Sequence, residues 1–145
     1  MRQKQITSII QKYMPMLNSD SLVFQELLKC FSENALIQPD TNDLISFLSP
    51  RRLFNVIKIK SSSAEGCSKE LLQKHPLFSE AAGMIRYYNT PNDVNWADIE
   101  RAETTIGKTL AMDIYDWKPD MFTVFNSEKN TEYELVMIIA FSSEF

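Results

Sequence analysis

Residues 133–141 read YELVMIIAF, and no other stretch of the sequence constrains the fold as strongly. In a strand, successive side chains point to opposite faces of the sheet. One face would carry Tyr133, Leu135, Met137, Ile139 and Phe141, and the other Val136, Ile138 and Ala140. Both faces are apolar, which is typical of a strand covered on both sides. We therefore predict a central strand here, because at an edge the same strand would be prone to aggregation.

Two further strands are predicted around this centre. Met121 to Phe125 precedes it, and the intervening residues 126–130 read NSEKN, which favours a hairpin turn. Leu53 to Lys60 reads LFNVIKIK, a run of branched and aromatic residues that also indicates a strand. Apolar residues at three-and-four spacing predict helices over residues 6–15, 23–31, 42–48, 68–72, 76–88 and 95–117. The expected fold is α+β, with several helices around a small, mainly antiparallel sheet of about three strands.

The composition fits an ordinary globular domain. The 145 residues suit one domain, 1–145, and 44% hydrophobic residues are enough to build a core. The N-terminal residues form no apolar signal sequence, and the longest apolar run, Leu135 to Phe141, is far shorter than the roughly 20 residues of a membrane span. We expect a cytoplasmic protein that does not enter a membrane. Cys30 and Cys67 provide no disulfide framework and are expected to be reduced.

Charge is unevenly distributed along the chain. Residues 1–75 contain ten Lys or Arg and seven Asp or Glu, whereas residues 76–145 contain five and twelve. The acidic C-terminal half would be repelled by a phosphate backbone, so general binding to nucleic acid is not expected. Arg51, Arg52, Lys58 and Lys60 form a small basic group, which we interpret as a charged strand end that keeps a sheet edge soluble.

Residues that could support catalysis or metal binding are few. The single histidine, His75, is separated from Cys67 by most of a predicted helix, so the two do not form a convincing catalytic pair. Cys67 is the better candidate for a reactive thiol, because the start of a helix lowers the pKa of a thiol. No metal-binding spacing is present. The sequence thus predicts no catalytic residue, no metal and no cofactor.

The strongest candidate site is a group of acidic residues on and after the long predicted helix. We predict that it binds a partner through Asp98, Glu100, Glu103, Asp113, Tyr115, Asp116 and Asp120. Carboxylates would steer a cationic partner, and an aromatic side chain would add buried area. In general profile, a small acidic chain without a catalytic set resembles the immunity proteins that bacteria pair with cationic nuclease toxins.

This profile predicts an inhibitor that covers the basic cleft of a protein such as a nuclease toxin. Two alternatives stay open, besides an adaptor that would bind nucleic acid through Arg51, Arg52, Lys58 and Lys60. One is a small hydrolase that uses a carboxylate pair, either Asp98 with Glu103 or Glu132 with Glu134. The other is an assembly module that forms homo-oligomers, for instance through the apolar C-terminal strand.

Overall fold

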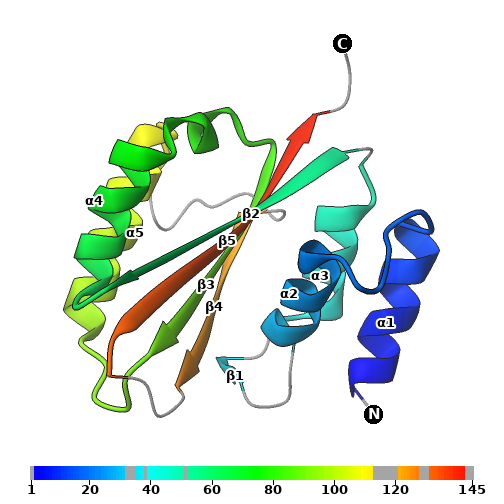
Figure 1. Ribbon diagram of the computed structural model, residues 1–145, viewed down its shortest axis with the longest axis horizontal. Coiled ribbons are helices and arrows are strands. Elements are labelled where there is room, and N and C mark those ends of the chain that lie inside the picture. Colours follow the sequence, from blue (N-terminus) through cyan, green and yellow to red (C-terminus); the bar gives the residue numbers. More distant parts are fainter. Residues whose placement is uncertain are drawn as a thin grey trace.

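The computed structural model describes residues 2–31, 35–37, 39–50, 52–112, 121–127 and 131–142. Its elements, in chain order, are α1 (Arg2–Tyr13), α2 (Leu22–Cys30), β1 (Ala35–Ile37), α3 (Thr41–Leu48), β2 (Arg52–Ser61), α4 (Ala64–Lys74), the 3-10 helix η1 (Pro76–Glu80), β3 (Gly83–Thr90), α5 (Trp96–Thr109), β4 (Met121–Ser127) and β5 (Tyr133–Ser142). Figure 1 shows the strands crossing the middle of the molecule, with helices on both sides. No described helix has the length and apolar character that crossing a membrane requires.

The strands form one mixed sheet in the order β1-β4-β3-β5-β2. Among the described strands, β3 and β4 are parallel and the other neighbouring pairs are antiparallel. The predicted α+β class and the mainly antiparallel character of the sheet are confirmed. The sheet has five strands where about three are expected, because β1 is very short and the pattern of β3 resembles that of a helix.

Strand β5 occupies the interior of the sheet, as its sequence predicts. It pairs with β3 on one side and with β2 on the other. Every side chain from Leu135 to Ala140 is at most 1% exposed. The apolar residues on its two faces are needed because helices cover both faces of the sheet.

Two hydrophobic cores lie on the two faces of the sheet. Helices α4 and α5 cover one face, where Ile57 and Ile59 of β2 join Met84 and Tyr88 of β3. Helices α1, α2 and α3 cover the other face, where Ile85 of β3 packs with residues of β4 and β5. In Figure 1 these two groups of helices lie on opposite sides of the sheet.

The predicted hairpin between residues 121–125 and 133–141 is wrong. Strand β4 pairs with β3 and β1, and β3 lies between β4 and β5 in the sheet. The parallel pairing of β3 with β4 needs a crossover connection, which α5 provides. Strands that follow each other in the sequence usually pair, but here β3 lies between β4 and β5 in the sheet.

The predicted helix over 76–88 is also wrong, because η1 and β3 occupy that range. Strand β3 is buried at nearly every position, so an apolar residue falls at every helical spacing as well. Helix α5 ends at Thr109, not at Trp117, and Ala111 follows with a positive φ of 56°. Helix α4 begins at Ala64, earlier than expected, because the Ser63 side chain caps it by accepting from the Gly66 N–H.

Candidate functional site

Asp98, the first of the predicted partner-binding residues, lies inside the fold. Its side chain is buried and accepts hydrogen bonds from the backbone N–H groups of Ala64 at 2.6 Å and Glu65 at 3.0 Å. These are two of the N–H groups that the first turn of a helix leaves without a partner inside the helix. Asp98 therefore joins the start of α5 to the start of α4, and the structure does not place its carboxylate on an exposed acidic face.

Glu103, another of the predicted residues, belongs to a buried polar cluster between α5 and the sheet. Its carboxylate lies 2.8 Å from Nε of Arg86, a residue that is fully buried. It also accepts from the Tyr88 hydroxyl at 3.0 Å and from the Thr123 hydroxyl. Burial, and secondly the nearby Glu103 carboxylate, raise the pKa of Tyr88 well above its ordinary value. The role of Glu103 in the structure is to compensate a buried charge.

The remaining predicted residues divide into two groups. Glu100 is exposed on α5. Outside the described residues lie Asp113, Tyr115, Asp116 and Asp120. Of the three described members, only Glu100 lies exposed at the surface, and binding of a cationic partner by the predicted set stays a prediction.

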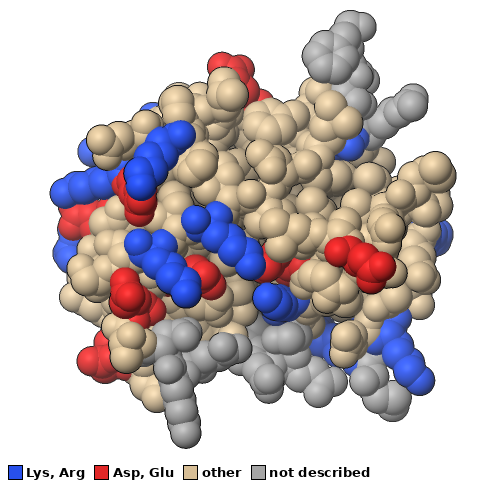
Figure 2. All heavy atoms as spheres, viewed as in Figure 1, with Lys and Arg blue, Asp and Glu red and all other residues tan. Residues whose placement is uncertain are grey.

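Charges of both signs alternate over α4 and α5. Glu65 lies 3.1 Å from Arg101 and 3.5 Å from Lys69, and Lys74 lies 2.5 Å from Glu70. Figure 2 shows the same mixture of blue and red at the left of the molecule. Cations within the acidic surface weaken the field that a cationic partner would meet.

Cys67 is not the reactive thiol that its place near a helix start suggests. It is buried, and burial raises its pKa to about 12. Cys30 is also buried, and burial raises its pKa well above the ordinary value. Within the described part of the chain, no three or more His, Cys, Asp and Glu residues gather in a way that could hold a metal ion.

We predict that both thiols react slowly with Ellman's reagent in the folded protein. At pH 8 the reaction should be at least about tenfold slower than in urea, because the thiolate is the nucleophile and burial disfavours it. Absorbance at the wavelength of the released thiolate measures both rates. If one thiol of the folded protein reacted as fast as in urea, the burial of Cys30 and Cys67 would be contradicted.

Strand β2 forms one edge of the sheet. Strand β2 pairs with β5 over all ten of its residues, from Arg52 with Ser142 to Ser61 with Tyr133. No other strand of the described chain pairs with β2, which is the last strand of the sheet. An unpaired edge presents N–H and C=O groups that can accept another strand.

Two apolar grooves flank the first half of β2, one on each face of the sheet. The η1 groove has a volume of about 300 Å³ and is lined by Asn55, Ile57, Ile139, Phe141 and residues 74–78. The α1–α3 groove has a similar volume of about 300 Å³ and is lined by residues 13–16, 48–50 and Arg52. Large apolar side chains stand exposed at these grooves and between them: Leu53 is 57% exposed, Leu77 72% and Met16 94%. Figure 2 shows mostly uncharged surface across the upper middle of the molecule, over the start of β2.

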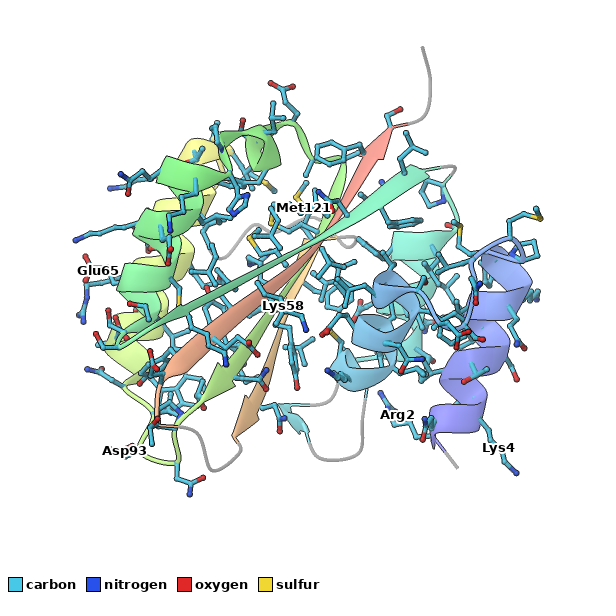
Figure 3. The ribbon with its side chains drawn as sticks, in the orientation of Figure 1. Arg2, Lys4, Lys58, Glu65, Asp93 and Met121 are labelled. Carbon is cyan, nitrogen blue, oxygen red and sulfur yellow. The ribbon has the colours of Figure 1, made fainter. Side chains whose placement is uncertain are left out.

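The second half of β2 is cationic. Nζ of Lys58 lies 2.5 Å from Oε1 of Glu26, a buried residue of α2, and Lys60 is exposed. Figure 3 shows Lys58 beside β2, on the side of α2. The basic group of the sequence thus lies at a sheet edge, except for Arg51, which falls outside the described residues. The apolar first half and the cationic second half distinguish the two ends of this edge.

Sequence reasoning misses this surface for an identifiable reason. The sequence predicts the strand over residues 53–60 and interprets its basic residues as a sheet edge, which the order of the strands confirms. It does not predict the two grooves, because they are formed by elements distant from β2 in sequence. Apolar spacing places Leu77 on a helix face, whereas it projects from η1 beside β2. A signal is present in Lys58 and Lys60, because charged residues that alternate with the apolar Ile57 and Ile59 indicate a strand with an accessible side.

Comparison with known proteins reveals a likeness of fold and no assignable family. No protein-family model and no curated protein matches the sequence. The structure matches FtsZ from M. jannaschii, solved as an empty dimer, with a TM-score of 0.61 and 14% identity over 91% of this chain. A point mutant of the same FtsZ gives a TM-score of 0.58 with 15% identity over 90% of this chain. The likeness is one of fold.

A third solved structure is more distant. TubZ of Bacillus thuringiensis serovar israelensis, solved as GDP-form protofilaments, gives a TM-score of 0.50 with 16% identity over 94% of this chain. This chain spans only 42%, 43% and 39% of the three proteins, respectively. At such identities the similarity describes the arrangement of helices and strands and leaves function open.

Proposed function

We propose that this chain is an assembly module that binds another polypeptide along the open edge of β2. The observation that carries the proposal is a ten-residue strand with no described strand on its outer side, flanked on both faces by apolar grooves. An added strand would gain main-chain hydrogen bonds from the edge, and its alternate side chains would enter the two grooves. Exposed apolar surface of this kind is typical of interaction sites.

The fold neighbours give the proposal secondary support. The matching FtsZ structure is described as a dimer and the TubZ structure as protofilaments, so both of these proteins were solved as assemblies. Neutralisation of a cationic partner such as a toxin stays a separate prediction. It rests on Glu100 and on the residues between 113 and 120 that the structure does not describe.

The proposal can be tested without knowing the partner. A displayed library of random ten-residue peptides is selected for binding to the wild-type chain. Peptides selected on the wild-type chain should bind the Leu53→Lys variant at least about tenfold more weakly, because the ammonium group would enter an apolar contact. Biolayer interferometry measures the dissociation constants. Leu22→Lys is the matched control, because Leu22 is 53% exposed and lines neither groove.

Selected peptides that bind Leu53→Lys as tightly as the wild type would contradict the proposal. The same conclusion would follow if Leu22→Lys weakened binding to the same extent as Leu53→Lys.

A further inference from the structure

We infer that the polypeptide bound at the β2 edge is a second copy of this chain, paired antiparallel about a two-fold axis at Phe54. The inference rests on the proposed function and specifies its partner. An antiparallel pair of identical edge strands makes one continuous sheet, and its two-fold axis stands perpendicular to that sheet. Each face of one copy therefore continues into the same face of the other.

This symmetry brings the two η1 grooves together. The η1 groove lies on the face covered by α4, so it would meet the η1 groove of the second copy. The α1–α3 groove lies on the opposite face at Arg52, so it would meet the surface beside Val56 of the second copy and not its own counterpart. Leu53 and Leu77, both more than half exposed, would then be covered by apolar groups. A surface that is self-complementary in this way suits a two-fold interface.

Charge determines where the axis falls. Residues that face each other across an antiparallel pair lie on the same face of the sheet, so the axis must pass through a residue and not between two. With the axis at Asn55, Arg52 would face Lys58, and with the axis at Val56, Arg52 would face Lys60. Like charges directly opposite each other destabilise a strand pair.

An axis at Phe54 avoids both conflicts. Leu53 then faces Asn55 of the second copy, and Arg52 faces Val56. The paired segment is residues 52–56, in which Arg52 is the only charged residue. An axis at Leu53 would also avoid opposed cations, but it pairs fewer residues.

The lysines of β2 exclude the longer pairings. An axis at Ile57 opposes no two cations directly, but it sets Lys58 of one copy diagonally across from Lys58 of the other and draws Lys60 into the interface. With the axis at Phe54, both lysines lie beyond the paired segment, and Lys58 keeps its contact with Glu26. The pairing over residues 52–56 is thus the longest one that leaves both lysines outside the interface.

Cysteine cross-linking tests both the partner and the axis. The chain has two cysteines and both are buried, so an introduced exposed cysteine is the only accessible thiol. Two proteins, Leu53→Cys and Asn55→Cys, are made with tags of different mass, mixed and oxidised. Residues 53 and 55 face each other across the axis, within disulfide reach, whereas 53 with 53 and 55 with 55 are diagonal pairs about 7–8 Å apart.

The expected product is the mixed disulfide dimer, at least about fivefold in excess over either homodimer, since the diagonal pairs exceed the Cα separation that a disulfide spans. Leu22→Cys, which is similarly exposed and lies off the edge, should give no more dimer than a reduced sample. A dominant Asn55→Cys or Leu53→Cys homodimer would overturn the axis at Phe54.

Sedimentation equilibrium of the proteins without introduced cysteines gives the second readout. The wild type should dimerise with rising concentration, and Leu53→Lys should raise the dissociation constant at least about tenfold while Leu22→Lys leaves it unchanged. A wild type that stays monomeric at every concentration would overturn the second-copy inference. Displayed peptides that still bound at Leu53 would then leave the proposed function standing, and an acidic consensus among them would identify a different protein as the partner.

Discussion

Changing Glu103 to Gln is expected to destabilise the fold by about 3–5 kcal/mol, because it leaves the Arg86 guanidinium charged and buried without a carboxylate. Arg86 has no exposed side-chain surface, and Nε of Arg86 lies 2.8 Å from Glu103. Urea unfolding followed by circular dichroism measures the loss as a shift of the midpoint at constant slope.

Glu100→Gln is the matched control for this change. It makes the same substitution on the same helix at an exposed position, and it should alter the free energy of unfolding by less than about 0.5 kcal/mol. The double variant Arg86→Met with Glu103→Met should recover much of the loss, since an apolar pair removes both buried charges. Equal effects of the two Gln substitutions would contradict the buried ion pair.

Changing Asp98 to Ala is expected to cost about 2–3 kcal/mol in the free energy of unfolding, because buried donors lose their acceptor. The donors are the buried N–H of Ala64 and the N–H of Glu65. The substitution also removes a carboxylate from the N-terminus of α4, where negative charge is stabilising.

Ser63→Ala provides the comparison for Asp98, because it removes the ordinary N-cap of the same helix and should cost about 1 kcal/mol. The free energy of unfolding lost by Asp98→Asn should lie between the losses of Asp98→Ala and Ser63→Ala, since the amide oxygen still accepts one hydrogen bond. Thermal or urea unfolding ranks the three variants. If Asp98→Ala were no more destabilising than Ser63→Ala, Asp98 would not connect α5 to α4 as the distances indicate.

These two carboxylates illustrate what the sequence can predict and what it cannot. The sequence identifies Asp98 and Glu103 as members of an acidic group on a helix. Whether such a residue faces solvent or the interior depends on what the neighbouring elements present to it. Here the start of α4 presents free N–H groups to Asp98, and β3 presents Arg86 to Glu103. Neither donor is close to its acceptor in sequence.

The elements themselves are predicted unevenly, for physical reasons. The prediction of β5 is correct because apolar residues on both of its faces are compatible only with a strand in the interior of a sheet. The pattern of β3 predicts a helix because continuous burial places an apolar residue at every spacing, helical spacings included. The order of the strands, which makes β2 an edge, depends on contacts between distant parts of the chain.

Amide hydrogen exchange along residues 52–56 is the most direct test of the accessible edge of β2, on which both proposals depend. Exchange is measured for the dilute protein, for the concentrated protein, and for the dilute protein with a selected ten-residue peptide. We predict that exchange within residues 52–56 slows in the last two samples, because added strands accept hydrogen bonds from the outward N–H groups of β2. Exchange there that remains as fast in both samples as in the dilute protein, while the peptide is demonstrably bound, would contradict an accessible β2 edge as the binding surface.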